Sequence, residues 1–334
     1  MADYTTIDNP ELYFQCKLYT GNGTAIGSGG QAITLDGDED MQPDFVWIKD
    51  RTDTDRPRLF DAVRGVTKEL DSSDATAETT LTEGLTAFGS DGFTVGNHEG
   101  VNSNTDSFVA WCWKESATAG FDIVSFTGNA TARTISHSLS AVPKMIIMKN
   151  LETVNAQWVV YHVSTGNTQA LYLNTTAVPT DVLGFFNDTD PTSSVFTVGT
   201  DTAVNGNTVG QINYAWSEKQ GFSKFGKYTG NGDADGAFIY TGFRPAYVMV
   251  KRTDSTSNWN IFDNKRNPYN NPGILLAANN SNADASSYPI DFLSNGFKAR
   301  STLADFNASG GTIVYMAFAE APFVNSNGVP CNAR

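Results

Sequence analysis

Apolar residues in this chain gather in short runs, separated by stretches rich in Gly, Asn, Ser, Thr and Asp. The run over residues 12–19 alternates apolar and polar side chains, which is typical of a strand with one covered face. The runs at 45–48, 145–148 and 247–250 are apolar at consecutive positions and indicate strands covered on both faces. No segment has convincing helical periodicity. The pattern predicts an all-β protein.

The same landmarks recur along the chain at a nearly constant spacing. Tyr-Thr-Gly-Asn-Gly at 19–23 returns in similar form at 126–130 and 228–232, and its Gly-Asn-Gly core favours a tight turn. A proline precedes each doubly apolar run, and an aromatic residue closes each unit. A period of about 100 residues is too long for a solenoid repeat and matches a domain. We expect equivalent, buried positions for the anchors of this repeat, which are Pro43, Pro143, Pro245, Trp113, Trp216 and Phe318.

The spacing predicts three tandem antiparallel β-sandwiches of jelly-roll or lectin-like type. They occupy residues 11–116, 117–219 and 220–321, called the first, second and third segments below. An N-terminal arm of residues 1–10 precedes them, and a C-terminal tail of residues 322–334 follows. The linkers are short, so we expect the segments to touch, either as a semi-rigid rod or as a compact cluster.

The net charge of −14 is concentrated at the N-terminal end. Residues 1–115 carry 8 Lys/Arg and 21 Asp/Glu, whereas residues 220–334 carry 10 and 8. Such an acidic face argues against a nucleic-acid partner, which needs clustered cations. The acidity either keeps the chain soluble or forms a docking face for a basic neighbour or for cations. We expect the arm and the first segment to dock on a basic partner while the third segment points away.

The residues that could carry chemistry are few. The three histidines, His98, His137 and His162, fall in different segments, and no hydrolase or nucleotide-binding motif occurs. We therefore expect a protein without catalytic activity or cofactor. Two acidic loops resemble the start of a calcium site, although solvated turns are the alternative for both and the first lacks the terminal glutamate of a calcium loop. The candidate ligands are Asn231, Asp233 and Asp235, and more weakly Asp36, Asp38 and Asp40.

The sequence predicts structural roles for the cysteines and tryptophans. Cys16, Cys112 and Cys331 form no metal-binding or disulfide pattern. Exposed tryptophans on loops would suit sugar binding, but all six lie in strand-like runs, so we expect at least four in the core. No stretch is apolar enough to span a membrane, and the first ten residues lack the features of a signal peptide.

The combination of motifs resembles a repeat in virion proteins of marine podoviruses such as cyanophages. The likeness runs from about Asp8 to Phe323 and is carried by the opening Leu-Tyr-Phe-Gln at 12–15, the motif at 19–23, and the runs at 42–49, 91–96 and 108–113.

The resemblance implies a structural protein of the phage particle, often a tail or tail-fibre protein that contacts the host surface. A capsid or neck decoration protein is the alternative, and an envelope-degrading depolymerase is a third reading. It also implies a virion location after synthesis in the host cytoplasm. The implied partners are other virion proteins, further copies of the chain in a homo-oligomer with a trimer favoured, and a host glycan or protein.

Overall fold

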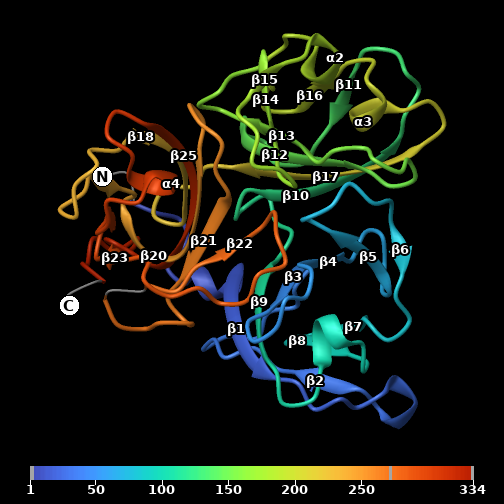
Figure 1. Ribbon diagram of the computed structural model, residues 1–334, viewed down its shortest axis with the longest axis horizontal. Coiled ribbons are helices and arrows are strands. Elements are labelled where there is room, and N and C mark those ends of the chain that lie inside the picture. The colour runs from blue at the N-terminus through green and yellow to red at the C-terminus, as the bar shows by residue number, and fades with distance from the viewer. Residues whose placement is uncertain (1–3, 271–272, 332–334) are drawn as a thin grey trace.

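The computed structural model describes residues 4–270 and 273–331, and it is built almost entirely of antiparallel strands. Strands make up 41% and helices 7%, which confirms the predicted all-β class. Figure 1 shows three lobes arranged around a common centre, coloured blue to cyan, green to yellow and orange to red along the chain. Among the described residues, no helix is long and apolar enough to cross a bilayer.

Three large sheets form the inner part of the lobes, and their strands follow one another in matching order. The first has the order β1-β9-β3-β4-β5-β6 (Phe14–Thr20, Ser107–Trp113, Phe45–Asp50, Arg58–Asp61, Lys68–Asp71, Thr79–Thr80). The second has the order β10-β17-β12-β13-β14-β15 (Phe121–Thr127, Gly210–Ser217, Pro143–Asn150, Val159–His162, Gln169–Tyr172, Thr180–Asp181). The third has the order β18-β25-β20-β21-β22 (Ser223–Thr229, Thr312–Pro322, Phe243–Arg252, Trp259–Asp263, Leu276–Ala277).

Smaller sheets lie on the outer side of each lobe and complete the sandwiches. They are β2-β8-β7 (Gln31–Ile33, Gly92–Val95, Leu85–Gly89), β11-β16 (Arg133–Ser136, Val195–Val198) and β19-β24-β23 (Phe238–Tyr240, Gly296–Ala299, Ile290–Leu293). The helices are single turns: α1 Glu99–Asn102, α2 Leu183–Phe186, α3 Thr202–Asn205, α4 Ala304–Asn307, and the 3-10 turns η1 Pro10–Leu12 and η2 Ile26–Ser28.

The central strands are covered on both faces, as their consecutive apolar residues predicted. In β3, Val46 and Ile48 pack with residues of the small sheet, whereas Phe45 and Trp47 point into a cluster that residues of all three segments share. Side chains alternate between the faces of a strand, so one continuous apolar run serves two cores. All six tryptophans are buried, which confirms their expected place in the core.

The aromatic anchors of the repeat meet in the shared cluster. Trp113, Trp216 and Phe318 lie in β9, β17 and β25 and are 2%, 1% and 1% exposed. The ring of Trp113 lies 6.2 Å from that of Trp216 and 5.6 Å from that of Phe318, between ring centroids. The three segments are therefore packed together, as a compact cluster and not as a rod.

The anchoring prolines are buried but do not all occupy the same place in a strand. Pro43 precedes β3, and Pro143 is the first residue of β12. Pro245 lies inside β20, where the pairing with β25 is irregular on both of its sides. Pro143 and Pro245 nevertheless hold matching register positions, because each pairs with the residue that follows the aromatic anchor, Ser217 and Ala319. The pairing is irregular beside both prolines, and such a bulge tolerates a residue that cannot donate to the ladder.

Polar bonds between the segments close them into a ring. The Tyr214 hydroxyl of the second segment donates to Asp61 of the first at 2.7 Å. His162 of the second contacts the Tyr315 carbonyl oxygen of the third at 3.1 Å. The indole N–H of Trp111 in the first donates to Asp263 of the third at 3.0 Å. Each segment thus bonds to both of the others.

The N-terminal arm lies on the third segment. The Tyr4 hydroxyl donates to the Gly242 carbonyl, and the Thr5 hydroxyl donates to the Gln220 carbonyl, both at 2.8 Å. Ile7 is 3% exposed and belongs to the shared core. The first and last described residues lie beside the third lobe, since Tyr4 bonds to Gly242 and the Cys331 N–H donates to the Phe323 carbonyl (Figure 1). The expected placement, with the third segment pointing away from the arm, is wrong for residues 4–10, and Met1 to Asp3 lie outside the described residues.

Candidate functional site: an acidic cavity in the first segment

The predicted calcium loop at 231–235 is engaged by donors of the protein itself. The side-chain oxygen of Asn231 accepts the N–H of Asp233 at 3.0 Å. Asp235 pairs with Lys298 at 2.7 Å and with Arg300 at 3.0 Å, and these cations lower the pKa of its carboxyl group. The loop therefore behaves as a turn held by ion pairs.

Residues 36–40, the weaker calcium candidate, also form contacts with other residues of the protein. Asp36 forms an ion pair with Lys17, and the N–H of Asp38 donates to the Glu11 carboxylate at 3.1 Å. Asp38 and Asp40 are exposed. Within residues 4–270 and 273–331, no group of three or more His, Cys, Asp or Glu side chains is placed to hold a metal ion.

Three buried asparagines in the short helices explain the recurring Tyr-Thr-Gly-Asn motif and were missed by sequence reasoning. Each is fully buried, and its side-chain oxygen accepts the N–H of the asparagine in the turn. The signal was available, because an apolar residue followed by Asn recurs with the spacing of the other landmarks. The pairs are Asn102 with Asn22 (2.7 Å), Asn205 with Asn129 (3.0 Å) and Asn307 with Asn231 (3.1 Å).

His98 and His162 lie in different segments, and the ring of each accepts a backbone N–H. His98 accepts the Gly100 N–H at the start of α1. His162 is 1% exposed and accepts the Ser164 N–H at Nδ1, which leaves the Nε2 proton to donate to Tyr315. Burial lowers the pKa of His162 to about 4, so its imidazole is neutral at pH 7. These contacts give His98 and His162 structural roles.

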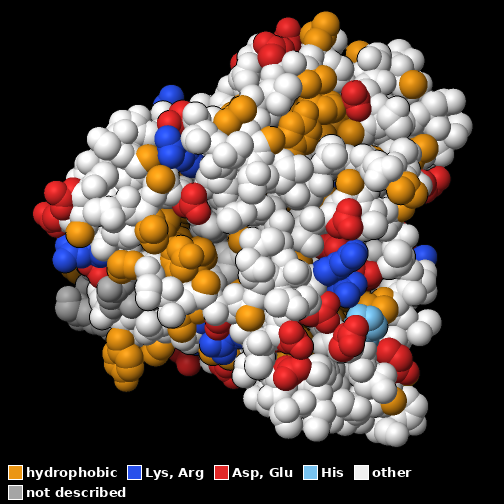
Figure 2. All heavy atoms as spheres, in the orientation of Figure 1, with side chains coloured by type: hydrophobic (Ala, Val, Ile, Leu, Met, Phe, Trp, Pro, Cys, Tyr) orange, Lys and Arg blue, Asp and Glu red, His pale blue; other side chains and the backbone are white. Residues whose placement is uncertain are grey.

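A cavity of about 230 Å³ opens beside α1 in the first segment, and every residue that lines it has an oxygen-bearing side chain. Figure 2 shows acidic side chains gathered over this lobe, at the lower right of the view. None of its lining residues is aromatic. The lining residues are Asp50, Asp53, Thr54, Asp55, Glu99, Ser103 and Asp106.

The most buried residue of the cavity wall is Asp50, the last residue of β3, which is 1% exposed. Its Oδ1 accepts the N–H groups of Thr52 and Asp53 at 2.7 and 2.9 Å, which turns the chain out of the strand. Burial raises the pKa of Asp50. The neighbouring Lys49 amine donates to the Asp50 carbonyl at 2.6 Å, and burial lowers the pKa of Lys49 to about 8.

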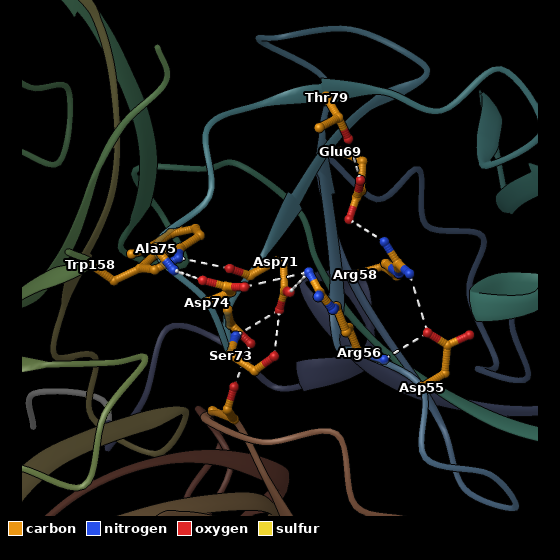
Figure 3. A network of polar contacts seen from close by, with 12 residues as sticks. Asp55, Arg56, Arg58, Glu69, Asp71, Ser73, Asp74, Ala75, Thr79 and Trp158 are labelled. Atoms are coloured by element: carbon orange, nitrogen blue, oxygen red, sulfur yellow. Dashed lines mark hydrogen bonds and ion pairs between the residues drawn. The ribbon is translucent and has the colours of Figure 1, made fainter. Parts of the chain in front are cut away.

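One side of the cavity is held by a network of ion pairs (Figure 3). Arg58 contacts Asp55 at 3.2 Å and Glu69 at 2.6 Å, and Glu69 accepts the Thr79 hydroxyl at 2.5 Å. Arg58 thus compensates Asp55 but contacts none of the other four carboxylates of the cavity wall. The cavity keeps a large excess of negative charge.

The same network ties the first segment to the second. Arg56 pairs with Asp71 at 3.3 Å, and the carbonyl of Asp71 accepts the indole N–H of Trp158 in the second segment at 2.8 Å (Figure 3). The strands that flank the cavity are therefore fixed by a neighbouring lobe.

A second hollow, of about 440 Å³, lies in the third segment and has a mixed lining. Tyr269 on its rim is 79% exposed. The polar groups beneath are already engaged, since Asn270 accepts the Phe292 N–H at 3.2 Å and Arg244 pairs with Glu320. This hollow offers an aromatic surface with few free polar groups.

The chain matches a family whose description is a domain of unknown function, DUF7483, over residues 9–322. The chain belongs to the DUF7483 family. The match begins next to η1 and ends with β25, so the DUF7483 domain covers all three large sheets and their shared core. A comparison with curated proteins finds no match.

Proposed function

We propose that the chain is a non-enzymatic structural protein of a bacteriophage particle, associated with the tail as an appendage that contacts the host surface. The resemblance of its motifs to virion proteins of marine podoviruses supports this assignment. The observation that supports a structural role is the ring of three segments packed around one aromatic core. Hydrogen bonds join each segment to both of the others, so the protein resists deformation, as a component of a phage particle must.

The distribution of polar groups supports a role without catalysis. His98 and His162 are engaged in structural bonds, and the acidic cavity has carboxylates without an aromatic surface for a sugar ring. A glycan-cleaving depolymerase would place its two acids beside such a binding surface. We therefore rank the depolymerase below both structural roles.

A decoration or connector protein of the capsid or neck is the second candidate. It is favoured by the compact three-lobed body, in which the first and last described residues lie beside the same lobe (Figure 1). A fibre instead needs an elongated arrangement of its modules.

The test is to locate the protein in purified particles. Mass spectrometry of the particles and immunogold labelling with an antibody to the purified chain should place it at the tail. Gold on the capsid shell or at the neck would favour the decoration role. Absence of the chain from particles that infect normally would refute a virion function.

The expected homotrimer has its own measurement. Light scattering of the purified chain should give three times the mass of the 36.0 kDa chain. A monomer would show that the internal ring takes the place of a symmetric assembly of copies.

A further inference from the structure

Two features that distinguish the third segment meet at its hollow of about 440 Å³. The first is a longer connection between β21 and β22, which contains Tyr269 on the rim of the hollow. The paired residues Asn260 and Ala277 lie 17 positions apart along the chain, whereas the matching pairs of the other segments lie 13 positions apart. Those matching pairs are Val159 with Tyr172 and Arg58 with Asp71. The extra chain is not needed for the repeated fold, and the longer connection forms part of the wall of the hollow.

The second feature is Arg244, the residue before Pro245. The residues before the other two anchoring prolines, Gln42 and Val142, are exposed and uncharged. The repeated fold therefore does not require an arginine at this position. Arg244 is 8% exposed, and among the described residues that line the hollow it is the only charged one.

The guanidinium group of Arg244 is only partly satisfied by the protein. Its Nε forms an ion pair with Glu320, but its two terminal nitrogens donate to no described residue. Donors that are largely shielded from water and lack an acceptor are costly. A carboxylate that enters the hollow would supply two parallel acceptors for this fork of N–H groups.

The other groups around the hollow suit the ring and the hydroxyl groups of a sugar. Tyr269 is 79% exposed, and a tyrosine ring can pack against the apolar face of a sugar ring. Asn295 is held by its backbone carbonyl, which accepts the N–H groups of Thr241 and Gly242 at 3.0 and 3.2 Å. Its side-chain amide lines the hollow and bonds to no described residue. An amide offers both donors and an acceptor, which matches the bonding capacity of a hydroxyl group.

We propose that this hollow binds an acidic saccharide, in which Arg244 pairs with the carboxylate of a sugar residue and Tyr269 covers the apolar face of its ring. The volume of about 440 Å³ lies within the range of roughly 300–1,000 Å³ that is usual for ligand pockets. None of the described residues that line the hollow is acidic, so it lacks the pair of carboxylates that would cleave a glycosidic bond. This inference rests on the proposed function and deepens it, because it names the class of host-surface ligand.

The test titrates the full chain with the methyl glycosides of glucuronic acid, galacturonic acid and N-acetylneuraminic acid. Methyl glucoside and methyl galactoside are the matched neutral probes, and acetyl-Gly-Gly supplies a peptide carboxylate. Two-dimensional NMR with at least one acidic glycoside should show shifts of the backbone amides of Asn270 and Asn295 and of the Arg244 Nε–H. The neutral probe should bind about tenfold more weakly because it lacks the charged acceptor. Added salt should weaken the binding of the acidic glycoside.

The decisive variant is Arg244→Gln, which copies the residue of the first segment. It should reduce the affinity for the acidic glycoside by about tenfold, to that of the neutral probe. Arg300→Gln makes the same charge change at the opposite end of the β23–β24 hairpin and should leave binding unchanged. Because Arg244→Gln also breaks the pair with Glu320, Tyr269→Ala gives a second test at an exposed side chain. It should weaken the binding of acidic and neutral glycosides alike.

The proposal is overturned if none of the three acidic glycosides shifts the amides around the hollow, or if acidic and neutral glycosides bind equally well. Unchanged binding to both Arg244→Gln and Tyr269→Ala would also refute it. Binding of acetyl-Gly-Gly without binding of any glycoside would instead assign the hollow to the C-terminus of a peptide. Glycoside binding is measured on the purified chain without particles, so its failure leaves the immunogold result on virion function standing.

Discussion

Trp113 is the residue whose removal best tests the shared core. Its ring lies 4.9 Å from Phe14 and 5.4 Å from Phe45 of its own segment, 6.2 Å from Trp216 of the second and 5.6 Å from Phe318 of the third, between centroids. Trp113→Ala therefore removes contacts in three lobes at once.

The expected loss of stability in Trp113→Ala follows from the buried area of the side chain and from the hydrogen bonding of its indole N–H. A buried tryptophan covers roughly 150–250 Å², which at about 25 cal/mol per Å² corresponds to about 4–6 kcal/mol. The indole N–H of Trp113 is buried without a hydrogen-bond partner among the described residues. Removing an unsatisfied donor returns about 1 kcal/mol, so we expect a loss of about 3–5 kcal/mol in the free energy of unfolding.

Trp158→Ala is the matched comparison. Trp158 is also buried, but its indole N–H donates to the Asp71 carbonyl at 2.8 Å. That truncation removes similar area, gains nothing from an unsatisfied donor and leaves a buried acceptor without its partner, so it should cost about 2 kcal/mol more than Trp113→Ala. Trp113→Phe, which copies Phe318, should cost the least of the three variants.

The assay is urea unfolding of the full chain followed by far-UV circular dichroism. Because the core is shared, Trp113→Ala should move one cooperative transition to lower urea. A loss below about 1 kcal/mol would refute the packing account. An early transition of about a third of the signal, with the remainder unmoved, would show that the segments unfold independently.

Three further variants test buried polar groups, each by urea unfolding. Burial lowers the pKa of His162 to about 4, so the stability that its neutral imidazole contributes is complete above pH 6.5 and is lost as pH falls towards 4. The difference in the free energy of unfolding between wild type and His162→Gln should therefore shrink over that range by up to about 3 kcal/mol. A difference that does not change with pH would contradict the burial of His162. The pKa of Glu115 is raised to about 7 by burial and by a hydrogen bond with Asp122, so the stability that its protonated form contributes is lost as pH rises from 4.5 to 7. Glu115→Gln should therefore gain stability relative to wild type over that interval, and a difference that does not change with pH would place Glu115 in water. Asn205→Ala should cost about 2 kcal/mol or more and expose the amide of Asn129 to faster hydrogen exchange, whereas unchanged exchange would show that the turn holds itself.

Local pattern was sufficient to predict the strand class and most of the buried residues. The run at 45–48 predicted a strand covered on both faces, and Phe45 and Val46 do point into different cores. The tryptophans were predicted as core because each lies in a strand-like run, and all are buried. Strand formation and burial depend on the alternation of neighbouring side chains, which is written directly in the sequence.

The tertiary structure alone decided how the segments meet and where polar residues became important. The bond from Tyr214 to Asp61 joins residues 153 positions apart, and no local pattern pairs them. The same holds for the placement of Thr5 on the third segment. In the sequence Asp50 was one acid among many, and only the folded chain placed it in the wall of a cavity beside α1. Hydrophobic periodicity specifies which face of a strand is covered but carries no information on which distant surface covers it, so contacts between segments emerge only when the chain closes on itself.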